Sequence, residues 1–452
     1  MRLITRDKSF YKTFFPLLIV ISLQNLASMA VNMVDNFMLG AYSELALSGA
    51  TLVNQIQFTL HQLVAGIGAG VAVLGAQYWG KGDIDPIRRI ASLGVKFAFV
   101  GGLIFFAATA IAPAGVLGLF TRDENVIAEG VIYLRLMCWT YIIFAISNTL
   151  VYSLQSVETA FIGTLMSVCT IIINGCLNYC FIYGNFGAPE MGIKGAAIAT
   201  LTSRTVELTI LLIYIFFIDK KLKIRLRHLF NLDFTYLRDF IKVSMPLVIS
   251  GGLWGVAQAA QTAILGHLGA AVIAANSIAG IVFQIFAVFG LSCANAASVT
   301  IGKTIGSGRL DMVRPYTKTL QVIFIILGVV AGAMIFIFKD LIVGLYTISD
   351  ETRKLTLQFL TILSITTVGT CYEYPVASGI IAGGGDTKYP AIVENTFMWL
   401  FIIPSAFLSA YVFKFSPVIT FCFLKVDQLL KCIPNGIRCN RYKWVRKLTK
   451  DI

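Results

Sequence analysis

A segment near the start of the chain is repeated in its second half. Residues 20–88 are echoed 226 positions later, and Gly80 and Gly82, for example, return as Gly306 and Gly308. A membrane chain that is built twice from one unit commonly forms two related halves with a cleft between them. We therefore expect two lobes and a central cleft that opens alternately to either side, as a secondary transporter requires.

The composition identifies the chain as an all-α membrane protein. Fifty-seven per cent of its residues are apolar, 13% are charged and the mean hydropathy is +0.80. A soluble protein of this composition could not cover its surface with polar atoms. A helix needs about 20 apolar residues to cross a bilayer core of ~30 Å. The apolar stretches predict twelve transmembrane helices, at residues 13–39, 46–75, 91–113, 130–155, 160–183, 195–218, 241–265, 272–300, 317–338, 355–382, 389–413 and 416–433.

The basic residues predict the orientation of the helices. If the N-terminus is cytoplasmic, 28 of the 36 Lys and Arg residues fall in cytoplasmic segments, as the positive-inside rule requires. The net charge of +13 therefore reflects topology and gives no reason to expect nucleic-acid binding. We expect a multi-pass membrane protein with both termini in the cytoplasm.

The most charged internal segment divides the chain into its two halves. We predict a six-helix lobe at residues 1–218, a basic cytoplasmic linker at 219–242, a second six-helix lobe at 243–434 and a basic cytoplasmic tail at 435–452. Six is an even number, so both lobes enter the membrane from the cytoplasm and the repeat is parallel, with its pseudo-two-fold axis along the membrane normal.

A stripe of polar residues on the first predicted span contains an acid. Asn25, Ser28, Asn32, Asp35 and Asn36 follow a spacing of three and four residues, which places them on one arc of a helix. A charged side chain inside a bilayer costs about 2.5–3.5 kcal/mol on insertion scales, so it is a functional candidate. Asp35 could exchange a proton or, with nearby amide oxygens, hold Na⁺; the alternative is a hydrogen bond between helices.

Two other spans of the first half also carry polar stripes. Asn174 and Asn178 are one turn apart on the fifth span, and Asn54, Gln57 and His61 form a similar stripe on the second. Amides in membranes often only join helices. Together with the acid of the first span, however, these five residues suggest a hydrated polar chamber in the first half.

The second half has its own candidates. Gln258 and Gln261 are the repeat equivalents of two polar positions of the first span, and Glu373 and Glu394 are the only acids there that we expect to be well buried. Either glutamate could balance a cationic substrate or a second coupling ion, or lie closer to a membrane interface.

The remaining charges of the spans predict structural roles. Arg204 and Glu207 are three residues apart and should form an ion pair, whereas Asp427, with Lys425 or Lys431, is expected at the interface. Three histidines without zinc spacing, and no Ser-His-Asp pattern, argue against an enzyme. We expect no cofactor and no metal beyond a possible Na⁺ at the first-span acid.

Several motifs resemble those of the multidrug and toxic compound extrusion (MATE) transporters. They are MVDNFMLG at 33–40, AQYWGKGD at 76–83, GAAIAT at 195–200, ASGIIAGGGDTKYP at 377–390 and KWVRKLT at 443–449. The resemblance covers essentially the whole chain. It implies a secondary antiporter of the plasma membrane, expected as a monomer, that exports organic cations and drugs in exchange for H⁺ or Na⁺.

The resemblance also implies an ion site and shows where this chain departs from the family. In one branch of the family an Asp on span one acts with an Asn and an Asp on span five; Asp35 and Asn174 match, but the third position is Asn178. That leaves one acid and keeps both the ion and the stoichiometry open. The family's span-one proline is Val20 here, and residues 247–263 lack the span-seven acid of another branch.

Two other classes of transport protein fit less well. A flippase for lipid-linked saccharides, from the same superfamily, would need a cleft lined by basic residues, yet only Arg204 lies in the middle of a span. A channel would favour a symmetric pore, whereas the repeat places Asp35 opposite Gln261. The leading hypothesis is therefore the cation-coupled antiporter.

Overall fold

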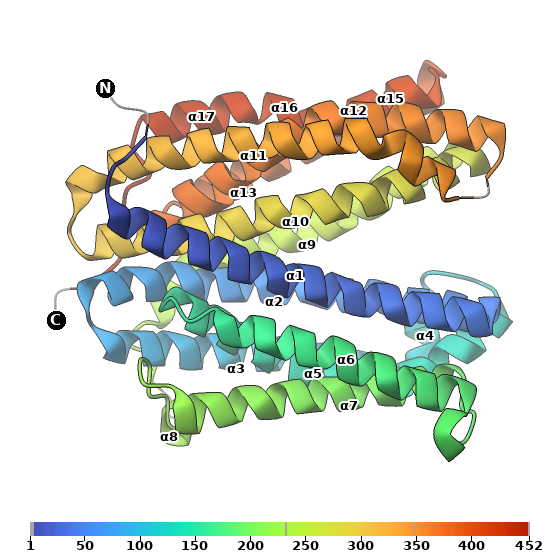
Figure 1. Ribbon diagram of the computed structural model, residues 1–452, viewed down its shortest axis with the longest axis horizontal. Coiled ribbons are helices and arrows are strands. Elements are labelled where there is room, and N and C mark those ends of the chain that lie inside the picture. Colours follow the sequence, from blue (N-terminus) through green and yellow to red (C-terminus); the bar gives the residue numbers. More distant parts are fainter. Residues whose placement is uncertain (1–3, 231–232, 347, 451–452) are drawn as a thin grey trace. The chain divides into compact units, whose positions relative to one another are not determined.

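The computed structural model describes residues 4–230, 233–346 and 348–450, and all regular structure in these ranges is helical (Figure 1). The long helices are α1 (Lys8–Tyr42), α2 (Glu44–Lys81), α3 (Ile84–Ile111), α5 (Glu124–Ser156), α6 (Phe161–Tyr183), α7 (Ile193–Ile213), α9 (Leu237–His267), α10 (Ala270–Gly306), α11 (Leu310–Gly344) and α12 (Asp350–Tyr374). The shorter elements are α4 (Pro113–Leu117), η1 (Asn185–Gly187), η2 (Tyr214–Ile218), α8 (Leu226–Phe230), η3 (Pro375–Ile381), α13 (Lys388–Thr396), η4 (Phe397–Ile402), α14 (Ile403–Phe407), η5 (Leu408–Val412), α15 (Pro417–Lys425), α16 (Asp427–Leu430) and α17 (Cys432–Asn440).

The helices have the lengths that a bilayer requires. Within the described ranges, eleven helical stretches are long and apolar enough to cross a membrane, and each covers one of the first eleven predicted spans to within two residues. The twelfth, at 416–433, falls in α15, α16 and α17. Val426 N–H donates to Cys422 O (2.9 Å) where α15 meets α16, and Lys431 N–H donates to Asp427 O (2.8 Å) where α16 meets α17. Large apolar side chains such as Phe37 and Phe217, 79% and 83% exposed, fit a lipid-facing surface.

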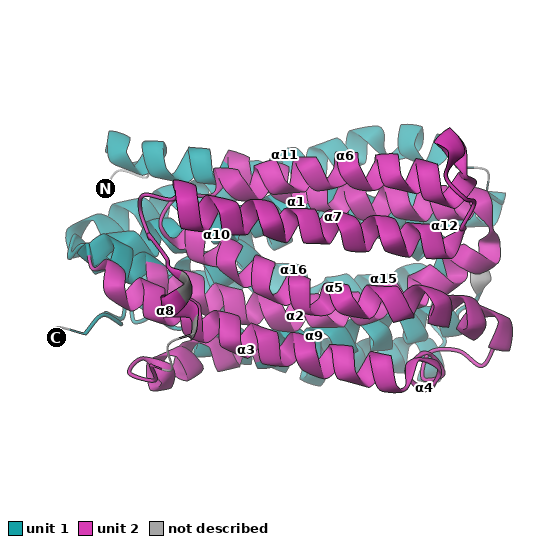
Figure 2. Ribbon diagram, turned by 90° about the horizontal axis from the view of Figure 1, so that it is seen from below, with its two compact units in different colours: residues 1–18, 76–82, 249–452 teal, residues 19–75, 83–248 magenta. Residues whose placement is uncertain are grey.

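The chain packs into two compact units (Figure 2). Unit 1 contains residues 1–18, 76–82 and 249–452, and unit 2 contains 19–75 and 83–248. Helices α1, α2 and α9 therefore each pass from one unit to the other. The lobe boundaries predicted from the sequence, 1–218 and 243–434, stay a prediction.

Unit 2 is built from α3 packed on α5, with α7 packed on both α5 and α6. Asp123 caps α5, because its Oδ1 accepts a hydrogen bond from the Asn125 N–H at 2.9 Å. Gly184 ends α6 in a left-handed conformation (φ 70°), which glycine adopts without steric penalty.

Unit 1 is built around α12, which packs against α10 and α11. Its core includes Phe359 and Phe421, whose rings stack 4.0 Å apart. Ser349 caps α12 by accepting from the Thr352 N–H at 3.3 Å. Pro375 follows α12, and since proline has no N–H to donate, the helix continues as the wider π-helical segment η3.

The repeated glycines allow the ends of α2 and α10 to approach closely within unit 1. A Cβ at Gly80 would collide with the Lys303 carbonyl, and a Cβ at Gly306 would collide with the Gln77 carbonyl. The next glycine of each copy, Gly82 or Gly308, turns the chain with φ of 81° or 75°. The repeat thus preserves a backbone contact that any larger residue would obstruct.

The basic segment 219–242 packs against the start of α3. Arg88 Nε donates to the Leu222 carbonyl at 2.6 Å, and Arg89 forms an ion pair with Asp233 at 2.6 Å. The Thr235 hydroxyl and N–H, with Arg89, hold the pKa of Asp233 below its ordinary value. The linker is therefore attached to unit 2 by specific contacts.

The C-terminal tail docks onto the glycine-rich turn that follows η3. The Arg446 N–H donates to Gly384 O at 2.9 Å, and Gly384 lies so close to the buried ring of Trp444 that a Cβ would collide with it. Asp386, only 2% exposed, pairs with Arg438 at 2.5 Å and Arg446 at 3.2 Å. Gly385 has φ of 103°, a turn that strongly favours glycine.

The same tail reaches the end of α2. Gln77 Nε2 donates to the Arg446 carbonyl at 3.1 Å, and Gln77 Oε1 accepts from the Leu448 N–H at 2.8 Å. Lys81 Nζ donates to the Lys450 carbonyl at 2.6 Å. The three sequence motifs at 76–83, 377–390 and 443–449 are therefore parts of one dock in unit 1.

Candidate functional site

Asp35 of α1 lies at the centre of a buried polar network in unit 2. Its Oδ1 accepts from Asn178 Nδ2 at 2.5 Å, and its Oδ2 accepts from the Thr200 hydroxyl at 3.4 Å. Asn174 Nδ2 donates to Thr200 Oγ1 at 3.2 Å, and Asn174 Oδ1 accepts from Asn178 at 3.2 Å. Asp35 is 5% exposed and the other three are 7% or less. The three residues predicted for ion coupling therefore lie in direct contact.

Two members of this network were not predicted from the sequence. Thr200 comes from α7, and Tyr133 comes from α5 and lies beside Thr200. Thr200 is the last residue of the motif at 195–200, which resembles the family but by itself indicates no role for this residue. Tyr133 is one of many aromatic residues in the spans, and no spacing separates it from those that only pack.

The network supplies oxygen atoms and little positive charge. In the described part of the chain no Lys or Arg forms an ion pair with Asp35, and the buried Asn178 Oδ1 has no hydrogen-bond donor. A carboxylate in a membrane interior with no basic side chain in ion-pair contact is suited to bind a proton or a monovalent cation. The amides and the Thr200 hydroxyl would orient the carboxylate for either ion.

The other polar residues predicted for the first-half chamber lie outside this network. Asn32 is exposed. Asn54 of α2 donates to Asn36 Oδ1 at 3.5 Å. Gln57 is partly buried with its Oε1 unpartnered among described residues, and His61 contacts Gln62 through Nδ1 at 3.3 Å. The stripe on α1 therefore splits, with Asp35 turned inward and Asn32 outward.

The predicted ion pair on α7 is confirmed. Arg204 and Glu207 are 2.7 Å apart. Glu207 also accepts from the Thr170 hydroxyl at 3.4 Å, and the Arg204 guanidinium lies 5.7 Å from the Phe144 ring centroid. Since its charge is paired, Arg204 does not form a lone basic site.

The repeat equivalents in α9 are uncharged and partly or fully buried. Gln261 is 6% exposed, and its Nε2 donates to Met398 Sδ at 3.4 Å. Gln258 is half-buried. Unit 1 thus has no copy of the Asp35 carboxylate at this position.

Both second-half glutamates bind the same lysine. Lys431, at the junction of α16 and α17, lies 3.4 Å from Glu373 Oε1, 2.6 Å from Glu394 Oε2 and 3.0 Å from Asp427 Oδ2. Glu373 comes from α12 and Glu394 from α13. We call these four residues the Lys431 cluster.

The Lys431 cluster confirms one expectation and corrects another. Asp427 was expected to lie with Lys425 or Lys431, and it pairs with Lys431 at 3.0 Å and is 5% exposed. Glu373 and Glu394 were expected to be the only well-buried acids of this half, yet Asp386 is also buried, against two arginines. In each case a basic residue close in space permits the burial, and for Asp386 sequence spacing did not show it.

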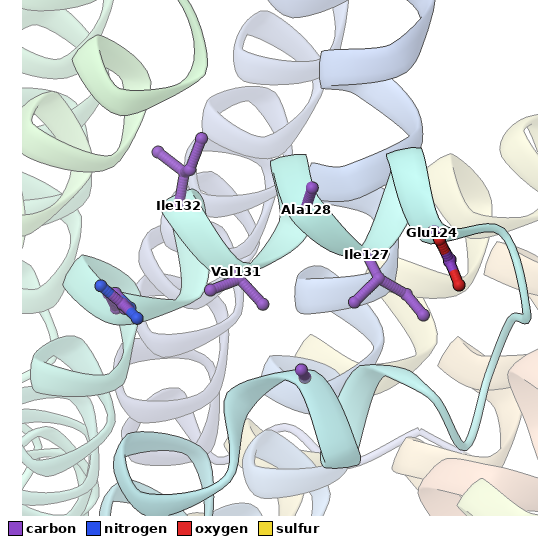
Figure 3. A pocket seen from close by; sticks show the side chains of 7 residues that line it. Glu124, Ile127, Ala128, Val131 and Ile132 are labelled. Atoms are coloured by element: carbon purple, nitrogen blue, oxygen red, sulfur yellow. The ribbon is translucent and has the colours of Figure 1, made fainter.

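A surface pocket lies elsewhere in unit 2 (Figure 3). It has a volume of about 510 Å³ and is lined mainly by apolar side chains of α4 and α5, including Ile127, Val131 and Ile132. None of the predicted site residues lines it. It is therefore not part of either polar cluster.

Comparison with known proteins places the fold and the family. The model of the MatE family matches residues 21–180 and 246–408. A probable multidrug resistance protein NorM of Listeria innocua is 25% identical over 398 residues, which cover 87% of this chain and 86% of that protein. A probable multidrug resistance protein NorM of Thermotoga maritima is 25% identical over 401 residues and covers 86% and 84%.

Solved structures show the same fold. A Vibrio cholerae MATE transporter superposes with a TM-score of 0.88 at 16% identity, covering 97% of this chain and 98% of that one. The eukaryotic MATE transporter AtDTX14 has a TM-score of 0.85 at 19% identity, and 97% of each chain is covered. The predicted all-helical membrane fold is thereby confirmed.

Proposed function

Because the chain belongs to the MatE family of membrane transporters, we propose that it is a secondary active antiporter that exports organic cations and drugs in exchange for H⁺ or Na⁺. The names of its relatives support drugs as substrates. The observation that carries the coupling proposal is Asp35, a buried acid held by Asn178 and Thr200 without a basic partner in the described chain.

Asp35 is proposed as the group that binds the coupling ion, with Asn174 and Asn178 as its supporting amides. An ion that binds there neutralises a buried carboxylate, and its release restores the charge. The two charge states would favour different arrangements of the surrounding helices, which is how an ion gradient can drive alternating access. Whether the ion is H⁺ or Na⁺ follows from the experiment below.

The alternative, a flippase for lipid-linked saccharides, would need basic residues that are available to an anionic headgroup. Arg204 is paired to Glu207, and Lys431 faces three carboxylates. The charges of the described spans therefore favour cationic substrates. We further propose that both termini are cytoplasmic, that the protein resides in the plasma membrane and that it acts as a monomer.

Efflux from proteoliposomes tests this proposal. The efflux of a fluorescent organic cation is measured under a Na⁺ gradient and, separately, under a pH gradient. We expect one gradient to drive the export by the parent protein, and Asp35→Asn to abolish it. Asp340→Asn, which makes the same change at an exposed position of α11, serves as the matched control. Uphill export by a folded Asp35→Asn variant would refute the assigned role.

A further inference from the structure

The Lys431 cluster carries more negative than positive charge. One ammonium faces the carboxylates of Glu373, Glu394 and Asp427, so the formal charge of the four groups is −2. Lys425, the other cation nearby, lies over the rings of Phe283 and Phe421 at 5.8 and 5.7 Å, and counting it still leaves −1. Excess charge in a buried site is unfavourable unless it is balanced, so the cluster should take up either a proton or a further cationic group.

Only one of the three acids is accessible to an incoming cation. The side chain of Glu394 is 26% exposed, whereas those of Glu373 and Asp427 are 6% and 7% exposed. Lys431 holds Glu394 at 2.6 Å, its shortest contact in the cluster. A cation that binds Glu394 must therefore compete with the Lys431 ammonium.

The structure provides a new partner for Lys431 when Glu394 is taken. An ammonium has three N–H donors; that of Lys431 donates to Glu394 Oε2 at 2.6 Å and lies 3.4 Å from Glu373 and 3.0 Å from Asp427. Asn435 follows one helical turn later, is 1% exposed and donates to Glu373 Oε2 at 3.3 Å. Its Oδ1 is buried and accepts no hydrogen bond from the described residues. Asn435 Oδ1 is thus a buried acceptor, one helical turn from Lys431, that could take the N–H donor that Glu394 gives up.

We propose that Glu394 binds the protonated amine of a transported cation and that Lys431 is a tethered competitor for this carboxylate, which sets the affinity of the site. The inference rests on the proposed export of organic cations and names the class of cation that binds in unit 1. Because a carboxylate accepts two N–H donors, the site favours primary and secondary ammonium groups over quaternary ones. Lys431 withdraws toward Asp427, Glu373 and Asn435 when the amine arrives.

Equilibrium binding of dansylcadaverine, a fluorescent primary amine, to the purified full-length protein tests the proposal. Glu394→Gln should weaken binding by about tenfold, the factor that corresponds to one charge-assisted hydrogen bond. Lys431→Met should tighten binding by a similar factor, because the competitor is gone. Glu351→Gln and Lys354→Met make the same charge changes at exposed positions of α12, and both should leave the affinity nearly unchanged.

The two substitutions should change the affinity in opposite directions, and this distinguishes the proposal from a cluster that only stabilises the fold. If Lys431 only stabilised the fold, its replacement would weaken binding or leave it unchanged, and either result overturns the proposal. If Lys431→Met does not fold, Lys431→Gln replaces it, with the thermal melt as the check on folding. Equal affinity for dansylcadaverine and its trimethylammonium derivative would overturn the preference for N–H donors. If export depends on Asp35 but the binding measurements contradict the expected changes in affinity, this inference is refuted and the proposed antiport function stands.

Discussion

Asp386 should hold the C-terminal tail in its dock. Its buried carboxylate pairs with Arg438 and Arg446, and a hydrogen bond to a charged group contributes about 1.5–3 kcal/mol. The side chain of Arg446 is 45% exposed, so its share is discounted to about 1 kcal/mol or less. An amide at this position keeps one neutral hydrogen bond, so Asp386→Asn should destabilise the docked tail by about 2 kcal/mol. That is roughly a thirtyfold increase in the undocked fraction.

Limited proteolysis measures this fraction. Trypsin cuts after Arg446 and Lys447 only when the tail is free, and the rate follows the open population when docking is fast. We expect Asp386→Asn to speed these cuts about thirtyfold. Asp85→Asn removes the ion pair to Arg89, in which both side chains are largely exposed (53% and 42%), and should change the rate little. An unchanged rate in folded Asp386→Asn would show that the carboxylate does not hold the tail.

Three further predictions concern the ion site, the glycine contact and the topology. Asn178→Asp places a second carboxylate beside Asp35 and should change the ion or pH dependence of vesicle efflux more than substrate affinity; an unchanged dependence would show that position 178 does not tune the ion. Gly80→Ala should lower the melting temperature in detergent well below that of Gly101→Ala, because a Cβ at 80 collides with Lys303 whereas one at 101 meets no atom within 4 Å; equal melting temperatures would refute the close approach. A cysteine introduced at Ser43 should react with an impermeant maleimide in intact cells, and one introduced at Arg225 should not. Both are made in a protein from which the exposed Cys176 and Cys422 have been removed. The reverse labelling pattern would show that the proposed topology is inverted. Asn231, another linker position that we expect to be cytoplasmic, lies outside the described residues.

The motifs that identify the family describe mostly the dock and only partly the candidate site. Gly80, Gly384 and Trp444 stand out in the sequence because close packing restricts each of them to one size of side chain. Asp35 was found from the cost of a membrane charge, a property of one residue in one span. Signals of this kind are local, so they could be read without knowing the fold.

The amino-acid sequence by itself determined the helical membrane fold, the repeat and the identity of Asp35, since apolar length, periodicity and isolated charge are properties of single segments. Only the tertiary structure decided which side chains contact the charged residues of the spans. Thr200, which is 165 residues away in the sequence, donates a hydrogen bond to Asp35. Lys431 forms ion pairs with two glutamates of other helices. Whether a buried acid stays unpaired, as Asp35 does, or meets a lysine, as Glu373 does, depends on which helices pack together. That choice is made by side chains distant in sequence, and one span cannot reveal it.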